Sequence, residues 1–160
     1  EDSMVKFWRP RDKHGCFSNF SGHPILVDGK IYKTTEHYYQ SKKFYEEDAQ
    51  EAVRKAKTPM QSKDMANGEI PMIVNRVKLH PKLRPDWEEV KFGIMKEALR
   101  YKVQQHEDVK QELLSTGDET LVEDSPYDYV WGVGKDGTGT NLLGKAWMEI
   151  RSELRSGVIA

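Results

Sequence analysis

An amphipathic segment in the middle of the chain limits the possible architectures more strongly than any other pattern. After Pro85, large apolar residues recur every three or four positions, the spacing that puts them on one face of an α-helix. The stripe comprises Trp87, Val90, Ile94, Met95, Ala98, Leu99 and Tyr101. We therefore predict that the longest helix begins at Pro85 and that most of this stripe faces the core.

Five further helices are expected, several of them bounded by capping residues or a closing glycine. They cover residues 34–44 with Thr34 or Thr35 as N-cap, 47–57, 58–67 with Thr58 as N-cap and Pro59 in the first turn, 106–116, and 143–154. Strands are expected only over short stretches. These are 5–8, the hairpin of 25–27 and 30–32 around Asp28-Gly29, and 121–123.

The segment from Glu69 to Arg84 holds two prolines and no clear period, which predicts a surface loop. The whole pattern predicts a mainly α fold with a few short β-strands at its margins. At 160 residues, two domains would each be short of core. We therefore expect one compact domain over 1–160, with a core of about 5–155.

Composition and charge narrow the class of protein. Hydrophobic residues make up 37% and charged residues 32%, the mixture of a soluble globular protein rather than a disordered or membrane-bound one. The formal net charge of −1 argues against a broad basic surface for nucleic acid but leaves room for recognition of a phosphate or of one modified base. The longest apolar runs, such as 24–27, are too short to span a bilayer, so no membrane partner is expected.

Cys16 is the only cysteine, so no intramolecular disulfide can form. The acidic first residues are followed by no apolar stretch of the kind that secretory leaders carry. Both features predict a reducing, intracellular and cytoplasmic setting. Cys16 has no neighbours at metal-ligand spacing, and His37 and His106 stand isolated, so we expect no metal and no cofactor.

The polar face of the expected helix at 34–44 is the most informative candidate for chemistry. Glu36, Gln40 and Lys43 lie at i, i+4 and i+7, one above another on a helix. The carboxylate of Glu36 could transfer protons at a ribosyl group, and the amine of Lys43 could attack an anomeric carbon. Spacing alone favours a simpler interpretation, a solvated polar face.

Two loops could complete a site. Residues 128–144 hold five glycines ahead of a helix, and their backbone N–H groups could bind a phosphate, although a flexible turn is the default interpretation. In the other loop, Phe17 and Phe20 flank Ser18 and Asn19, so the rings could stack on a base while the amide reads its edge. A core role for both phenylalanines is equally compatible with the sequence.

Taken in order, these segments resemble one known family. The words are Phe-Ser-Asn-Phe at 17–20, Glu-His-Tyr-x-Gln-x-x-Lys-Phe at 36–44, a long Trp-containing helix, Leu-Val-Glu at 121–123, Asp-x-x-Trp-Gly-x-Gly at 128–134 and Asn-x-Leu-Gly at 141–144. They are similar to the YbiA-like, or NADAR, family. The resemblance covers about residues 5–155, and the ordered occurrence of several uncommon words makes it specific.

The resemblance implies a mainly helical fold and metal-free hydrolysis by an N-glycosidase. Family substrates are ribosylated compounds: phosphoribosylamino-pyrimidine intermediates of riboflavin biosynthesis, and ADP-ribose on guanine bases, free or in DNA or RNA. Matched position by position, the motif residues are Glu36, Lys43 and Asp128, expected to be catalytic, and Asn19, Trp131, Gly132, Asn141 and Gly144, expected to bind substrate. The residue arguments above add Phe17, Ser18, Phe20 and Gln40 as substrate contacts.

Two departures from the family pattern bear on the substrate. Val133 stands where some relatives carry an acidic residue after Trp-Gly, so a role for that carboxylate does not transfer to this chain. The 69–84 segment is longer than in the compact bacterial-type members, which predicts a different pocket rim.

The mechanistic hypothesis gives the two ends of the polar row different tasks. Glu36 assists ring opening or protonation at the ribosyl group, and Lys43 forms a Schiff base at C1 that water hydrolyses. The lysine must be neutral to attack, so its pKa must be lowered, and Lys42 is one candidate perturber.

Around this pair, Asp128 would orient Lys43 or a ribose hydroxyl. Trp131 with Phe17 or Phe20 would stack the base, and the glycine loop with Asn141 would take phosphate. Two alternatives stay open. One is a carboxylate-only glycosidase acting through Glu36 and Asp128, and the other is a non-catalytic ADP-ribose or nucleotide-binding module.

Overall fold

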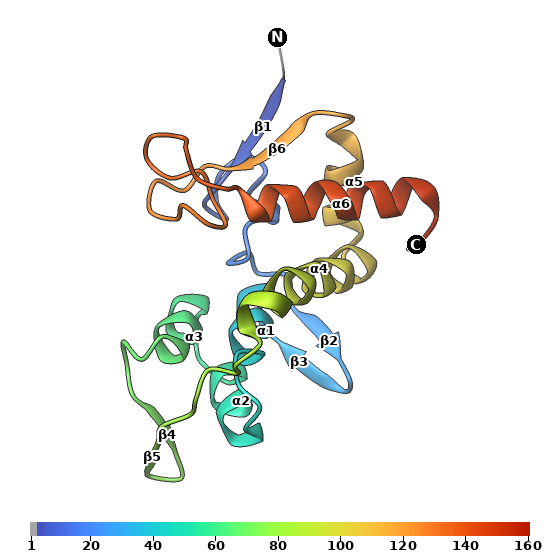
Figure 1. Ribbon diagram of the computed structural model, residues 1–160. Helices are drawn as coiled ribbons and strands as arrows, with labels where there is room; N and C mark the ends of the chain where they lie inside the picture. The colour runs from blue at the N-terminus through green and yellow to red at the C-terminus, as the bar shows by residue number, and fades with distance from the viewer. Residues whose placement is uncertain (1–2) are drawn as a thin grey trace.

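A computed structural model describes residues 3–160, which form six α-helices and three pairs of short strands, with the strand pairs at the edges of the molecule (Figure 1). The helices are α1 (Thr35–Ser41), α2 (Glu47–Arg54), α3 (Pro59–Ala66), α4 (Trp87–Gln105), α5 (Glu107–Ser115) and α6 (Leu142–Ser156), with a short 3-10 helix, η1, over Gly15–Phe17. The predicted mainly α fold with a few short strands in one compact domain is confirmed.

The strands form three two-stranded sheets, one of which joins distant parts of the chain. The strands are β1 (Met4–Phe7), β2 (Ile25–Val27), β3 (Lys30–Tyr32), β4 (Met72–Val74), β5 (Val77–Leu79) and β6 (Thr120–Glu123). β1 and β6 run parallel, side by side at the top of Figure 1. β2 and β3 form the predicted hairpin, in which Asp28 and Gly29 both have positive φ, as a tight Asp-Gly turn requires.

The segment 69–84, predicted as a surface loop, contains the β4–β5 hairpin. Its turn residues, Asn75 and Arg76, adopt φ values of 50° and 66°. Met72 of β4 is buried and packs with Phe44 in an apolar cluster under α2. The loop prediction was wrong, because a turn with arginine in place of glycine hides the hairpin and only tertiary packing supports it.

α1 begins where predicted but ends early. The hydroxyl of Thr34 accepts a hydrogen bond from the backbone N–H of His37 at 3.2 Å, which identifies Thr34 as the N-cap. The helix stops at Ser41 instead of reaching Phe44. Lys43 therefore lies in the turn beyond the helix, not on it.

Other helix boundaries shift by a few residues. α4 begins at Trp87 rather than Pro85, with Asp86 as its N-cap, and α2 ends at Arg54 rather than at 57. Thr58 caps α3 as predicted, accepting from the N–H of Gln61. Among residues 3–160, no helix combines the length and apolarity that crossing a membrane requires.

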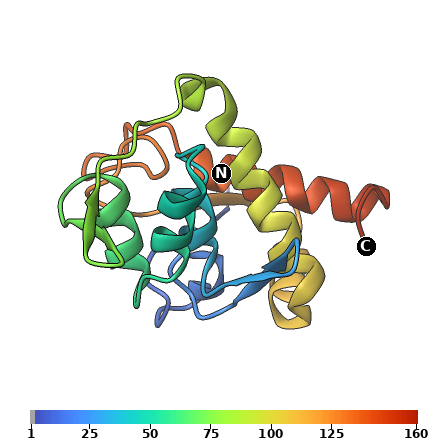
Figure 2. The same ribbon diagram turned by 90° about the horizontal axis from the view of Figure 1, so that it is seen from below.

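The main apolar core lies between α4, α5, α6 and the β1–β6 pair. α4 packs against α6, and the two helices cross in Figure 2. Trp87, Met95 and Leu99 of the predicted stripe are buried in this core, and Ala98 is buried in a second cluster against the β2–β3 hairpin. The packing fixes α4 behind α1, so one face of α1 is left to border a cavity.

Candidate active site

A cavity of about 650 Å³ opens between α1, α3, the loop after η1 and the segment after β6. Its size is that of a small-molecule site. Three carboxyl groups and two amines reach it, those of Glu36, Glu123, Asp128, Lys43 and Lys63. We name it the carboxylate cavity.

Glu36 lies in the first turn of α1 with only 7% of its surface exposed. Its Oε2 accepts a hydrogen bond from Nε2 of Gln40 at 2.6 Å, one helical turn away. Burial raises the pKa of Glu36, and the negative charge of Asp128 acts in the same direction. This carboxyl therefore holds a proton more readily than one in water.

Lys43 reaches the same cavity from the turn after α1. Its backbone N–H donates to the carbonyl of Gln40 at 3.2 Å, which keeps the chain coiled for one more residue. The Nζ atom donates to Oδ1 of Asn67, at the end of α3, at 2.9 Å. The row of Glu36, Gln40 and Lys43 thus lines the carboxylate cavity together even though the helix stops short of the lysine.

Burial also changes the amine. It lowers the pKa of Lys43, and the positive charges of Lys63 and Lys91 act in the same direction. Lys42, the perturber expected from the sequence, is not among the main causes, because its Nζ turns over the ring of Tyr38 instead. The lowered pKa increases the neutral fraction of Lys43, the form in which an amine is a nucleophile.

Asp128 borders the cavity from the loop after β6. Its Oδ1 accepts hydrogen bonds from the backbone N–H groups of Val130 and Trp131, at 2.9 and 2.8 Å. The turn held in this way presents Trp131, whose ring meets Tyr39 edge-on with centroids 5.3 Å apart. The indole ring of Trp131 therefore lines the cavity beside the carboxyl groups.

Glu123, the last residue of β6, is a site residue that sequence reasoning missed. Burial raises its pKa to about 8, and the negative charges of Asp128 and Glu36 act in the same direction. Its buried Oε2 has no hydrogen-bond partner among residues 3–160. Glu123 lines the carboxylate cavity, and at neutral pH its carboxyl favours the protonated form far more than one in water does. The sequence signal was the family motif Leu-Val-Glu at 121–123, of which Glu123 is the last residue, but no role was assigned to it.

Three residues of the first loop, Ser18, Asn19 and Phe20, line the cavity. The amide of Asn19 accepts from the hydroxyl of Thr35 at 2.8 Å and donates to the sulfur of Met95 at 3.3 Å. It thereby ties the loop to α1 and α4. Asn19 is consequently held rigidly, with part of its side chain at the cavity wall.

Four residues expected to contact substrate lie outside the cavity lining: Phe17, Gly132, Asn141 and Gly144. Phe17 is fully buried against Trp147 in the core. The amide of Asn141 donates to the carbonyl of Leu121 at 2.9 Å and accepts from the N–H of Glu123 at 3.0 Å. The structure gives these four residues packing contacts and puts none of them in the lining of the carboxylate cavity.

The two motif glycines allow close packing behind β6. A Cβ atom on Gly144 would lie 2.0 Å from the carbonyl oxygen of Leu121, and one on Gly132 would lie 2.8 Å from Oε2 of Glu123. Both positions therefore exclude a side chain. The glycine-rich stretch from Gly132 onward positions β6 and Glu123 instead of bordering the cavity.

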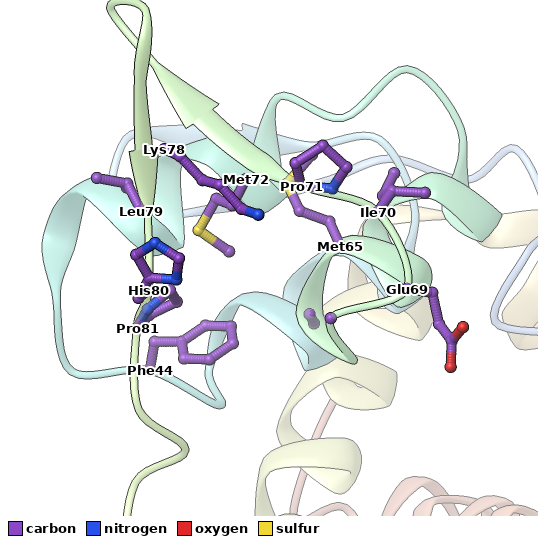
Figure 3. A pocket seen from close by; sticks show the side chains of 12 residues that line it. Phe44, Met65, Glu69, Ile70, Pro71, Met72, Lys78, Leu79, His80 and Pro81 are labelled. Carbon is purple, nitrogen blue, oxygen red and sulfur yellow. The ribbon is translucent and has the colours of Figure 1, made fainter.

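A second cavity, of about 480 Å³, lies between the end of α3 and the β4–β5 hairpin (Figure 3). Phe44, Met72 and Pro81 contribute apolar walls, and the carboxyl of Glu69 points away from them. Among residues 3–160, Glu69 is the single acidic residue that lines it. We name it the hairpin cavity.

The histidines differ from their sequence-based description. His37 is buried and bonded to the hydroxyl of Thr34 and the carbonyl of Ala56, as a structural histidine is. His106, expected to be isolated, lies with its ring centroid 4.9 Å from that of His23. That expectation was wrong because these two residues are distant in sequence and meet only in the fold.

Comparison with known proteins identifies the family. The model of the NADAR domain matches residues 6–155. The chain belongs to the NADAR family. The NADAR protein N-glycosidase YbiA of Escherichia coli (strain K12) is 40% identical over 154 residues, which span 96% of this chain and 90% of that protein. The solved NMR structure of E. coli YbiA superimposes with a TM-score of 0.83, at 39% identity, over 99% of this chain and 88% of that one.

A longer NADAR relative is the chloroplastic riboflavin biosynthesis protein PYRR of Zea mays. It is 36% identical over 172 residues, which cover all of this chain but 26% of that protein. In the maize protein the matching region is therefore one part of a larger chain. The resemblance drawn from the sequence motifs is confirmed.

Proposed function

We propose that this NADAR domain is an N-glycosidase that hydrolyses the bond between a phosphorylated ribose, or the ribose of ADP-ribose, and a nitrogen base. One observation carries the proposal: Lys43, an amine with a lowered pKa, and Glu36 and Glu123, two carboxyls with raised pKa, line a single cavity. The reaction class agrees with the name of the 40% identical N-glycosidase.

The reaction begins with attack by the neutral amine. Nζ of Lys43 bonds to C1 of the ribose while the C1–O4 ring bond breaks, and O4 takes a proton from a carboxyl group. The nitrogen loses its own proton and then expels the base, so that the C1–base bond breaks and a Schiff base forms. Water adds to C1, and release of the free sugar regenerates the amine.

The two carboxyls with raised pKa have separate tasks in this scheme. Glu36, which lines the same cavity as Lys43, protonates the ring oxygen and accepts the proton that the attacking amine loses. Glu123 donates a proton to the departing base, the step for which a carboxyl still protonated at neutral pH is suited. Asp128 accepts a hydrogen bond from a ribose hydroxyl at the cavity edge.

Aromatic and cationic side chains bind the rest of the substrate. Trp131 and Phe20 line the cavity and stack on the base. Lys63 supplies positive charge beside Glu36 and Glu123, and we assign it to the phosphate. It replaces the glycine loop in this role, because the residues from Gly132 onward lie outside the lining.

Trapping with borohydride tests the covalent step. Protein mixed with substrate and reductant gains the mass of one sugar adduct, and peptide mapping locates it at Lys43. The same mixture with Lys43→Arg gives no adduct. Turnover without an adduct would favour the carboxylate-only glycosidase, and tight binding without turnover would favour the non-catalytic module.

Two substrate classes remain to be compared. A phosphoribosylamino-pyrimidine and an ADP-ribosylated guanine, each incubated with the protein and separated by chromatography, distinguish a riboflavin-related role from reversal of base modification. We place the activity in the reducing cytoplasm, where the single thiol, Cys16, stays reduced.

A further inference from the structure

Two histidines and an aspartate come together near the junction of α4 and α5. His23 lies in the loop before β2, His106 between the two helices, and Asp108 in the first turn of α5. One potential ligand atom of each lies within 4.8 Å of the others. None of the three lines the carboxylate cavity or the hairpin cavity. The group is therefore separate from the chemistry proposed above.

The spacing of the ligand atoms suits a small divalent ion. Nε2 of His23 lies 2.8 Å from Oδ2 of Asp108, and no pair of ligand atoms is more than 4.8 Å apart. Tetrahedral zinc, with bonds of about 2.0–2.1 Å, spaces its ligands about 3.3 Å apart. The present separations bracket that value. Asp108 is exposed, so rotation of its side chain can adjust the shortest one.

Each histidine already has one ring nitrogen held by the protein. Nδ1 of His23 lies 2.9 Å from the hydroxyl of Ser21, and Nε2 of His106 lies 2.6 Å from the carbonyl of Pro24. If both nitrogens donate, Nε2 of His23 and Nδ1 of His106 carry the lone pairs. Metal-binding histidines commonly use the second N–H in this way, which fixes the tautomer and the ring orientation.

The groups behind the histidines are themselves fixed. The hydroxyl of Ser21 accepts from Nζ of the buried Lys102 at 2.8 Å. The side-chain amide of Gln105 bonds both the N–H and the carbonyl of Leu26, at 2.8 and 2.9 Å. These contacts tie the loop of His23 to the end of α4. Little conformational entropy is lost when an ion binds ligands that are already ordered.

The chemistry of the three ligands also favours a cation. Oδ2 of Asp108 lies 2.8 Å from Nε2 of His23, so a carboxyl oxygen faces the imidazole ring. Two imidazole nitrogens and one carboxylate oxygen form a donor set that zinc accepts. An ion bound here replaces the proton that His23 and Asp108 share.

We infer that His23, His106 and Asp108 form a zinc site with three protein ligands and a fourth position open to water. The ion links the loop before β2 to the α4–α5 junction. Because it binds the folded chain alone, it raises the melting temperature in proportion to the logarithm of its concentration.

The decisive experiment adds Zn²⁺ to the unaltered chain after treatment with and removal of a chelator. In ¹H–¹⁵N spectra, the imidazole resonances of His23 and His106 shift and saturate at one equivalent, while those of His37 and His80 stay in place. This measurement needs no variant to fold. Absence of a shift at His23 and His106 up to about 1 mM Zn²⁺ overturns the inference.

Titration calorimetry on variants supplies the second readout. His23→Gln and Asp108→Asn each weaken zinc binding at least about tenfold. The matched control, His80→Gln, removes a histidine of the hairpin cavity and leaves affinity unchanged. Equal weakening in the control would mean that zinc binds elsewhere, and would overturn the site.

Discussion

The carboxylate cavity and the hairpin cavity lie on either side of two consecutive residues. Lys43 lines the first and Phe44 lines the second. Their volumes are comparable, about 650 and 480 Å³, but only the first brings several buried ionisable groups together. Volume alone therefore does not identify the active site. The difference is that burial shifts the pKa of Glu36, Lys43 and Glu123 toward the forms that transfer protons or attack carbon.

The largest effect on turnover is expected when one lysine of each cavity is replaced by arginine, which tests whether only the carboxylate cavity is catalytic. Lys43→Arg keeps the positive charge but removes the nucleophile, so turnover falls roughly 10⁴-fold or more while substrate binding survives. Lys78→Arg, in the hairpin cavity, changes kcat/KM by less than about twofold. Steady-state kinetics and titration calorimetry check both. Near-normal turnover in Lys43→Arg would leave Glu36 and Asp128 as the residues to test.

The corresponding exchange of carboxyl groups has a smaller effect. Glu123→Gln removes the proton donor and lowers kcat about 10²-fold. Since Glu123 acts in its protonated form, wild-type activity declines as the pH rises through about 8, and the variant lacks this decline. Glu69→Gln, in the hairpin cavity, leaves kcat unchanged and retains the loss of activity as the pH rises through about 8. An unchanged alkaline limb in Glu123→Gln would assign that limb to another group.

The pH dependence of the free energy of unfolding tests the raised pKa of Glu123 without any substrate. The pKa of Glu123 is about 8 in the folded state and about 4.3 when unfolded, so the folded state binds more protons between these values. Its contribution to the free energy of unfolding is therefore full below about pH 4.3 and is lost as the pH rises toward 8. Glu123→Gln removes this loss, gaining about 3–4 kcal/mol over the wild type between pH 5 and pH 8.

Urea unfolding at pH 5 and pH 8 measures that gain. Glu69→Gln is the control, and its difference from the wild type stays the same at both pH values. A pH-independent difference in Glu123→Gln would mean that the carboxyl is not buried as a neutral acid.

The smallest effect is expected in the hairpin itself. Arg76 holds a φ of 66°, a region that glycine adopts without strain. Arg76→Gly therefore raises the free energy of unfolding by about 0.5–1 kcal/mol and leaves turnover unchanged. Lys78→Gly, in the neighbouring strand, destabilises instead. A loss of activity in Arg76→Gly would mean that the hairpin contributes to catalysis.

Features set by neighbouring residues were predictable. The caps at Thr34 and Thr58 and the turn at Asp28-Gly29 depend on residues within one turn of the chain, and all were predicted. The 3.6-residue stripe of α4 was predicted for the same reason. The β4–β5 hairpin was not, since its support comes from packing Met72 against Phe44.

The candidate site was also predicted only in part from the sequence. The order of the motif words was sufficient to indicate the NADAR family and to select Glu36, Lys43 and Asp128, all of which line one cavity. Motif matching could not distinguish residues that line the cavity from residues that pack behind it. Asn141 belongs to the second kind, since its amide holds the backbone of β6.

The sequence determined the local elements and the chemical groups that the chain carries, because propensity, capping and periodicity act over a few residues. The tertiary structure decided which of those ionisable groups are buried beside one another in a single cavity. Burial and the fields of neighbouring charges depend on the end of β6 and one face of α1 lining the same cavity, an arrangement that no local pattern encodes. For that reason the pKa of Glu123 is raised only in the folded protein, and His23 meets His106 only there.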